Sequence, residues 1–381
     1  MRANICYPFV LNPTGGSFES TKLLIEHLDT DRFDPTIVFG VDGSAATSSR
    51  EAGVETDIVS LPHAVKERMR TDTGLMAELT LGVRLLPYIR TLRSYLLSNE
   101  VDLIHVNDGL AATIWGIAGK LTRTPIIWHV RSERPNVWDA LRLRLVDQLI
   151  FVAESNKRKF ASRSLNSIEI TVIHNGVDTD RFRPGKSTGL HEELGLSTDT
   201  PLVGFVGNLV SRKRPMLFVR SGLKAIEEGS SAHFVLVGED QGDFSRDIEQ
   251  AVSMAGCEER FHLLGYRGDI PQIMQSLDLL VLTSTAHGEA FPRVPLEAMA
   301  CGTPVISTDT AGVSEAVIDG KTGRIVDSGI SPEELGALLN DTVSAEDELT
   351  RWAQSSIERA VAQFSADDHA EEIMEFYQSI L

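Results

Sequence analysis

The sequence predicts an α/β protein built from two open parallel sheets. Short apolar segments of strand length alternate with segments of helical spacing over most of the 381 residues. The alternation is interrupted over residues 174–189, where Gly, Pro, Ser and charged residues cluster, and then starts again. Hydrophobic residues make up 42% of the chain, which is enough for proper cores. Strands that alternate with helices favour parallel sheets covered by helices on both faces.

The first half of the chain contains the segments expected for one such sheet. The segment "ANICYPFVL" is typical of a strand, and it runs into the glycine turn "NPTGGS". Residues 18–28 then have helical spacing, and residues 109–121 are expected to form a helix of small residues. Further strands are expected over residues 35–41, 55–61, 101–108, 124–132, 147–155 and 168–176.

The second half repeats the pattern. Its expected strands cover residues 201–209, 233–240, 260–266, 277–285, 303–308 and 323–327. We therefore predict an N-terminal domain over residues 1–178 and a C-terminal domain over residues 179–363, with a hinge between them. Residues 366–381 form an amphipathic helical pattern that no strand follows. Because open parallel sheets bind ligands beyond the carboxyl ends of their strands, two such domains are expected to face each other across a cleft.

Charge is distributed unevenly between the halves. Up to Lys186 the chain carries 23 basic and 22 acidic residues, and the remainder carries 13 basic and 32 acidic residues. The net charge of −18 disfavours nucleic acid as a partner. Residues 120–163 are locally basic, with ten basic and four acidic side chains. This excess has two interpretations: a solvated helix face, or a surface that meets an anionic acceptor or membrane headgroups.

Cysteine usage and hydropathy favour a cytoplasmic location. Cys6, Cys257 and Cys301 lie far apart in apolar contexts and have no metal-like spacing. Reduced thiols in the cytosol are therefore expected. The apolar run at the N-terminus is too short for a signal peptide, and no window of 18 apolar residues is present to span a membrane. A peripheral position on the inner membrane face remains open through the basic stretch.

Several nucleotide, metal and nucleophile motifs are absent from the sequence. No G-x-G-x-x-G follows the first strand, which weakens a dehydrogenase interpretation. The triplet Gly320-Lys321-Thr322 resembles the end of a P-loop, but it precedes a strand and lacks the first glycine. No G-x-S-x-G, H-E-x-x-H or C-x-x-C occurs. We therefore expect neither a metal nor a cofactor.

The strongest functional signal is a pair of acids in "HGEAFPRVPLEAMACGTPVIST", residues 287–308. Glu289 lies in the loop after the strand predicted for residues 277–285, and Glu297 lies one to two turns into the following helix. Pro near the start of this helix and Gly302 past its end are favoured placements. Free N–H groups at the helix start suit phosphate, and carboxylates suit hydroxyl groups. A nucleotide sugar offers both kinds of group.

This segment resembles the E-x7-E region of retaining glycosyltransferase family 4, a family of GT-B fold that uses nucleotide sugars. "VIHNGVDTDRFRP", "GFVGNLVSRKRP", "FVLVGED" and "SEAVIDGKTGRIV" are similar to the family in order and spacing. The likeness covers most of residues 170–330, and it is thinner in "PTGGS", "DLIHVND" and "IIWHVRSE" of the first half. The resemblance implies two Rossmann-like domains. It also implies a C-terminal helix, residues 364–381, that crosses back to the N-terminal domain.

The resemblance also implies roles for residues of the second half. Glu289 is expected to bind hydroxyls of the donor sugar, and Glu297 the ribose hydroxyls. Backbone N–H groups that face the sugar and the phosphates are expected at Phe291, Arg293 and Val294.

Further roles concern the diphosphate and the reacting sugar. Lys213 is expected to neutralise the leaving diphosphate. The family often has arginine where this chain has Asn208, and Arg212 is the expected source of the missing charge. Gly16 is expected to let the first loop approach the phosphate closely. His129 matches the family's histidine near the reacting sugar.

The predicted function is therefore that of a metal-independent retaining glycosyltransferase of hexosyltransferase type, active in cell-surface glycan biosynthesis. It would move sugar from a nucleotide-diphosphate sugar to a hydroxyl of a glycan, a lipid-linked molecule or a small molecule. The resemblance implies front-face attack by the acceptor, with domain closure excluding water. Two alternatives are a sugar-nucleotide 2-epimerase on the same scaffold and a non-catalytic nucleotide-binding protein.

Overall fold

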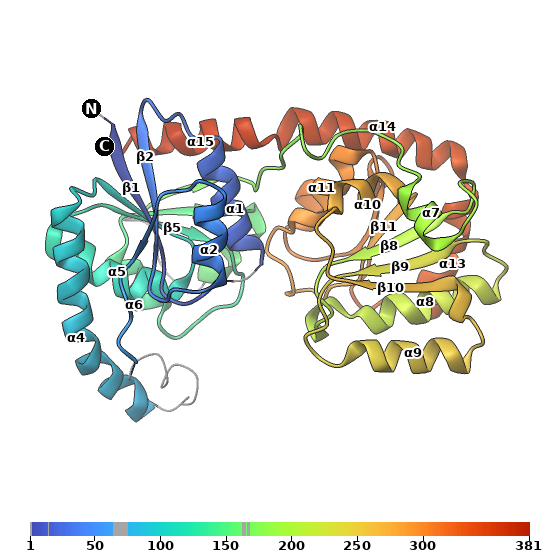
Figure 1. Ribbon diagram of the computed structural model, residues 1–381, viewed down its shortest axis with the longest axis horizontal. Coiled ribbons are helices and arrows are strands. Elements are labelled where there is room, and N and C mark those ends of the chain that lie inside the picture. The colour runs from blue at the N-terminus through green and yellow to red at the C-terminus, as the bar shows by residue number, and fades with distance from the viewer. Residues whose placement is uncertain (1, 14, 64–74, 162–164, 166–167) are drawn as a thin grey trace. The chain divides into compact units, whose positions relative to one another are not determined.

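The computed structural model of the chain describes residues 2–13, 15–63, 75–161, 165 and 168–381. The chain divides into two compact units (Figure 1). The first unit comprises Met1–His174 together with His369–Leu381, and the second comprises Asn175–Asp368. Each unit contains one fully parallel sheet. Thr14 of the first glycine turn and residues 162–164 of the basic stretch lie outside the described residues.

The first unit is built on a seven-stranded sheet of order β3-β2-β1-β4-β5-β6-β7. Every neighbouring pair is parallel. The strand order therefore reverses between β1 and β4, which leaves a crevice beyond their carboxyl ends in sheets of this kind. The strands are β1 (Ala3–Phe9), β2 (Phe33–Phe39), β3 (Thr56–Ile58), β4 (Leu103–Val106), β5 (Ile126–Val130), β6 (Gln148–Phe151) and β7 (Glu169–Val172).

Helices cover both faces of this sheet, because successive side chains of a strand point to opposite sides. In β1, Ile5, Tyr7 and Phe9 pack with residues of α1, α2 and α15, whereas Cys6 packs with residues of α4 and α5. The helices of this unit are α1 (Gly16–Glu26), α2 (Ser44–Glu51), α4 (Leu75–Ser98), α5 (Gly109–Thr122), α6 (Asp139–Leu145), the 3₁₀ helix η1 (Glu154–Phe160) and most of α15 (Ala366–Gln378).

The C-terminal helix α15 completes the core of the first unit, as predicted. Ala370, Ile373 and Tyr377 of this helix are fully buried among residues of β1, β2 and α1. These positions recur at helical spacing, so one face of α15 is apolar and the other carries its charges. The first unit therefore needs a segment that lies almost 200 residues from the rest of its sequence.

The second unit is built on a six-stranded parallel sheet of order β10-β9-β8-β11-β12-β13. Its strand order reverses between β8 and β11 in the same way. The strands are β8 (Leu202–Val206), β9 (His233–Val237), β10 (Phe261–Gly265), β11 (Leu279–Leu282), β12 (Val305–Thr308) and β13 (Gly323–Val326).

One face of this second sheet packs against α8, α9 and α13, through Phe218, Ile248 and Leu335 among others. Among the other helices of this unit, α11 packs against both α10 and α14. The helices are α7 (Gly189–Leu194), η2 (Ser211–Lys213), α8 (Pro215–Glu227), α9 (Phe244–Met254), η3 (Glu258–Arg260), α10 (Ile270–Ser276), α11 (Arg293–Cys301), α12 (Val313–Ala316), α13 (Pro332–Ser344) and α14 (Glu346–Gln363).

The prediction of two Rossmann-like parallel sheets is confirmed, but the predicted end of one strand was wrong. The strand expected to reach Thr285 ends at Leu282. Beyond Leu282 the carbonyl groups of Thr283 and Ser284 accept hydrogen bonds from the Arg214 guanidinium, and that of Ser284 also accepts one from the Thr308 hydroxyl of β12. These side-chain donors take the place of the backbone N–H groups that would continue the strand. The long helix α4 was not marked by the sequence analysis.

The contribution of α15 to the first core can be tested with Ile373→Ala. Truncating this buried side chain should destabilise the first unit by about 2–5 kcal/mol, because a cavity remains behind. Hydrogen exchange measured by mass spectrometry should show faster exchange in β1 and β2 peptides and little change in β8 and β9 peptides. Glu371→Ala, at an exposed position of the same helix, is the matched control. Equal effects of the two substitutions would contradict the packing described.

Candidate functional site

The charged site of the second unit begins where β8 ends. Gly207 follows the strand with φ of 139°, a conformation that suits glycine. A Cβ atom at Gly207 would lie 2.6 Å from Nζ of Lys213, so the lysine side chain lies directly over this backbone. Asn208 comes next and is partly buried, and η2 then carries Arg212 and Lys213.

Arg214 joins this loop to the end of β11. Its guanidinium donates hydrogen bonds to the carbonyl oxygens of Thr283 at 2.6 Å, Ser284 at 3.0 Å and Ser328 at 2.6 Å. In return, the hydroxyl of Thr283 donates to the carbonyl oxygen of Lys213 at 2.7 Å. Burial lowers the pKa of Arg214 below its usual value, because desolvation disfavours the charged form. Even a lowered arginine pKa leaves the group charged at neutral pH.

Glu289 meets both cations of η2. Its Oε1 atom accepts a hydrogen bond from Nη1 of Arg212 at 2.6 Å and lies 3.3 Å from Nζ of Lys213. The side chains of Glu289 and Lys213 are only 15% and 12% exposed, whereas that of Arg212 is 45% exposed. The structure thus brings together three residues predicted from sequence positions more than 70 apart. A largely buried carboxylate and ammonium stand at the strand ends, where the sheet order reverses.

The loop that carries Glu289 is held by residues from other elements. The side-chain amide of Asn175 donates to the carbonyl oxygen of Phe291 at 2.8 Å. A Cβ atom at Gly312 would lie 2.0 Å from the carbonyl oxygen of Ala290, so only glycine fits there. Phe291 itself is 4% exposed, and its ring lies 5.8 Å from that of Phe364.

Helix α11 starts immediately after this loop. Pro292 is its N-cap, and Gly302 ends it in the left-handed conformation, as predicted. Glu297 lies 3.2 Å from Nη2 of Arg293, one turn away, and both side chains are largely buried. The Nε atom of Arg293 is buried and has no hydrogen-bond partner among the described residues. Val294 is half-buried beside it.

The sequence analysis missed three residues that shape this site: Arg214, Asn175 and Gly312. A run of three basic residues at 212–214 gives no sign that the third turns inward to bind carbonyl groups. Asn175 had been assigned to the hinge, and its bond to Phe291 crosses 116 positions of sequence. Contacts of this length depend on tertiary structure.

The two candidates of the first unit lie at different depths. Gly16 is the first residue of α1 and is exposed, with nothing within 4 Å of the position of a Cβ atom. His129 lies near the carboxyl end of β5 and is fully buried.

His129 belongs to a buried chain of hydrogen bonds. Tyr7 and Tyr377 share one between their hydroxyl groups at 2.8 Å, and the Tyr377 hydroxyl also bonds to Nδ1 of His105. Nε2 of His105 lies 3.2 Å from Nδ1 of His129, and Nη2 of Arg131 lies 3.2 Å from the same atom. Burial raises the pKa of both tyrosines and lowers the pKa of both histidines, so all four are neutral.

The arginine sets the direction of this chain. Because Arg131 can only donate, Nδ1 of His129 must accept, and the proton of neutral His129 lies on Nε2. Nε2 of His105 then donates to His129, and Nδ1 of His105 accepts from Tyr377. The Nε2–H group of His129 is left buried without a partner among the described residues. An unsatisfied buried donor costs about 1–3 kcal/mol of stability, so this N–H group is the one member of the chain that keeps unused hydrogen-bonding capacity.

Two features are absent from the part of the chain that the structure describes. No group of three or more His, Cys, Asp or Glu side chains there could hold a metal ion. No helix there combines the length and the apolar character needed to cross a membrane.

Two Rossmann-like units, each with one point where the strand order reverses, are the architecture of the GT-B fold, which the glycosyltransferase structures named below share. The family models agree: Glycosyltransferase Family 4 matches residues 14–181, and Glycosyl transferases group 1 matches residues 187–359. The chain therefore belongs to the group 1 and family 4 glycosyltransferases.

Curated relatives are similar over part of their length. The chain is 32% identical over 222 residues to a D-inositol 3-phosphate glycosyltransferase of Nocardia farcinica (strain IFM 10152), covering 56% of this chain and 48% of that one. It therefore spans about half the length of this relative. It is 29% identical over 287 residues to the lipopolysaccharide core biosynthesis mannosyltransferase LpsB of Rhizobium meliloti (strain 1021), covering 67% and 80% of the two chains.

Solved structures share the fold over the whole chain. The Anabaena protein HepE in complex with UDP has a TM-score of 0.82 at 22% identity, covering 99% of this chain and 100% of that one. A glycosyltransferase from Rickettsia africae ESF-5 has a TM-score of 0.83 at 16% identity, covering 100% and 98%. At these identities the likeness establishes the fold.

The neutral histidine pair predicts an acid-sensitive first unit. The folded-state pKa of His105 and His129 is lowered, so protons bind preferentially to the unfolded chain as the pH falls below about 6.5. The contribution of the histidines to the free energy of unfolding should be fully present above that pH. Below it, the free energy of unfolding should decrease by about 1.4 kcal/mol per pH unit for each histidine. Urea unfolding followed by tryptophan fluorescence reports mainly on this unit, which holds Trp115, Trp128 and Trp138.

The matched variants are His105→Gln, which should reduce this pH dependence, and His287→Gln, an exposed position in the second unit, which should not. A pH dependence that is the same in wild type and His105→Gln would contradict the assignment.

Proposed function

We propose that this protein is a retaining glycosyltransferase that moves a sugar from a nucleotide-diphosphate sugar to an acceptor hydroxyl without a metal. The observation that carries the proposal is the contact of Glu289 with Lys213 and Arg212 at the ends of β8 and β11. Membership in the group 1 and family 4 glycosyltransferases supports the reaction class. The named activities of the relatives do not favour the 2-epimerase or the non-catalytic alternative.

The contact combines the two chemistries that a donor needs. Hydroxyl groups of the sugar can donate to the Glu289 carboxylate, and phosphate oxygens can accept from Lys213 and Arg212. The ion pairs at 2.6 and 3.3 Å hold these side chains in place before a donor binds. Donor binding therefore costs less side-chain conformational entropy. Glu297, already oriented by Arg293, is assigned to the ribose hydroxyls.

Cleavage of the sugar–phosphate bond places charge on the leaving diphosphate. Lys213 and the backbone N–H groups of Phe291, Arg293 and Val294, at the positive dipole end of α11, can stabilise that charge. Because these groups are fixed by Arg214, Asn175 and Gly312, they need no reorganisation during the reaction. We assign front-face attack by the acceptor, with its proton passing to the leaving phosphate oxygen.

The two first-unit residues are assigned different roles, His129 at the reacting sugar and Gly16 at the phosphate. His129 presents an Nε2–H donor that the chain from Tyr7 to His105 fixes in orientation. Gly16 offers exposed backbone at the start of α1, where N–H groups can meet phosphate.

Cell-surface glycan synthesis at the cytoplasmic membrane face is the proposed setting. The relative LpsB is named for lipopolysaccharide core biosynthesis, and residues 120–163 are basic. Sedimentation with anionic and with neutral vesicles tests the membrane contact. Failure to bind anionic vesicles would contradict the proposed membrane setting and would leave the proposed reaction untouched.

Glu289→Ala and Lys213→Ala should each lower turnover by about 10²-fold or more, since each removes a group that binds the reacting portion of the donor. Their melting temperatures should change little, because the pair contributes mainly to ligand binding. Lys224→Ala, which removes an exposed lysine from an ion pair on α8, is the matched control and should keep full turnover. The donor is first identified by thermal stabilisation with a panel of nucleotide sugars, UDP-glucose among them. Near-normal turnover in both site variants would defeat the assignment.

Retention and metal independence are tested on the wild-type protein. The anomeric configuration of the product, measured by NMR, should match that of the donor. Turnover should survive exhaustive treatment with EDTA, because side chains and helix N–H groups neutralise the diphosphate. An inverted product would exclude front-face attack, and activity restored only by a divalent cation would exclude the metal-independent site.

A further inference from the structure

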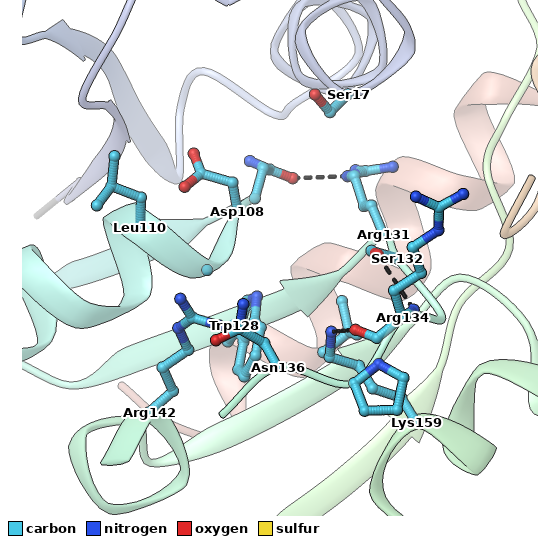
Figure 2. A pocket seen from close by; sticks show the side chains of 14 residues that line it. Ser17, Asp108, Leu110, Trp128, Arg131, Ser132, Arg134, Asn136, Arg142 and Lys159 are labelled. Carbon is cyan, nitrogen blue, oxygen red and sulfur yellow. Dashed lines mark hydrogen bonds between the residues drawn. The ribbon is translucent and has the colours of Figure 1, made fainter. Parts of the chain in front are cut away.

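The first unit contains a pocket whose charged lining residues, apart from Arg131, have no role assigned above. It lies beyond the carboxyl ends of β4 and β5 and has a volume of about 580 Å³. Figure 2 shows the side chains around it, which come from the start of α1, the loop after β4 and the start of α5, β5 and the loop after it, α6 and η1. All of them belong to the first unit, whereas Glu289 and Lys213 belong to the second. The lining therefore contains none of the charged candidate residues of the second unit.

Positive charge predominates in the pocket. Its lining includes Arg131, Arg134, Arg142 and Lys159, but Asp108 is the single acid among the lining residues. A second acid, the buried Asp139, lies behind it and is shared by two of the cations, at 2.8 Å from Arg142 and 3.6 Å from Lys159. Four cations thus face two carboxylates.

The two carboxylates are already committed to structural contacts. Asp108 is the N-cap of α5 and accepts a hydrogen bond from the N–H of Ala111 at 2.8 Å. Asp139 also accepts one from the N–H of Asn136 at 2.8 Å. The guanidinium of Arg134, by contrast, is exposed and has no partner among the described residues. At least one cation is therefore available to a ligand without breaking any existing contact.

The other cations are held in position around the pocket. A Cβ atom at Gly109 would lie 2.7 Å from Cζ of Arg142, so this guanidinium rests against the start of α5. Both Arg142 and Lys159 also lie over the indole ring of Trp128, at 5.9 and 5.7 Å. Nζ of Lys159 donates to the carbonyl oxygen of Arg134 at 2.6 Å, which ties η1 to the loop after β5.

We propose that this pocket binds a phosphate group carried by the acceptor. Several guanidinium groups around one concavity match the doubly charged, many-oxygen surface of a phosphate better than that of a single carboxylate. The volume leaves room for the polyol or sugar ring that would carry the attacking hydroxyl. The proposal rests on the proposed transferase function for its description of the ligand as an acceptor.

The phosphate has two possible sources, a soluble phosphorylated polyol or the headgroup of a lipid. Exposed apolar residues follow the pocket residue Asn136 in sequence: Val137 is 82% exposed, Trp138 37% and Leu141 36%. These side chains would suit contact with a lipid chain, and the experiment below separates the two sources.

The test uses NMR of the four tryptophan indole N–H groups, assigned by single Trp→Phe substitutions. Trp128 lines the pocket, and Trp138 lies two positions after the lining residue Asn136. Trp352 belongs to the second unit. Glycerol 3-phosphate should shift the Trp128 signal in the presence of saturating UDP, and glycerol, which lacks the phosphate, should not. Phosphatidylcholine vesicles with and without phosphatidic acid form the lipid arm, read from the Trp138 signal and from sedimentation.

Arg134→Gln should weaken glycerol 3-phosphate or phosphatidic acid binding about fivefold, and Arg134→Glu should weaken it further. Arg93→Gln, an exposed arginine of α4, is the matched control and should bind as the wild type does. Arg134-dependent binding of the soluble probe assigns a soluble acceptor, and Arg134-dependent binding of vesicles alone assigns a lipid acceptor.

The proposal is overturned if neither probe binds, or if binding is insensitive to both Arg134 substitutions. It is also overturned if Lys213→Ala abolishes binding, because the phosphate would then lie at the donor residues. The proposed function fails separately: wild-type protein that binds glycerol 3-phosphate but no nucleotide sugar would keep the pocket and lose the transferase.

Discussion

The arrangement of the second unit depends on the Arg214 guanidinium. It holds three backbone carbonyl groups at the ends of two different loops, and without it those carbonyls would be left without these partners. The two preceding residues, Arg212 and Lys213, are thereby placed beside Glu289 on the facing loop. The partly buried Arg214 binds backbone carbonyl groups, and the two other cations contact the acid of the site. Strand β11 ends at Leu282, immediately before the carbonyl groups that Arg214 binds.

Both units hold polar side chains in fixed orientations, but they use different interactions to do so. In the second, opposite charges in partial burial orient each other at the point where the strand order reverses. In the first, four neutral groups form a directed chain of hydrogen bonds, and Arg131 decides which nitrogen of His129 carries the proton. Both arrangements fix polar groups before a ligand binds, which is the condition for efficient electrostatic stabilisation.

The basic stretch of the first unit, residues 120–163, is more than a solvated helix face. Some of its cations, such as Lys120, form exposed ion pairs, but Arg142 and Lys159 turn inward to share Asp139. A sequence count of ten basic residues cannot make this distinction, because the direction of each side chain depends on α6 and η1 packing against Trp128.

The sequence by itself determined the alternation of strands and helices, the division into two sheets and the amphipathic C-terminal helix. These features follow from local periodicity, which survives in any chain with the same pattern of apolar residues. It also placed Glu289 and Glu297 on a loop and a helix, because Pro292 and Gly302 mark the ends of α11. Only the tertiary structure decided that Glu289 meets Lys213, that Asn175 holds Phe291 and that Tyr377 reaches His105. Each of these contacts joins residues at least 70 positions apart, and no local pattern encodes which distant side chain will fill a given place.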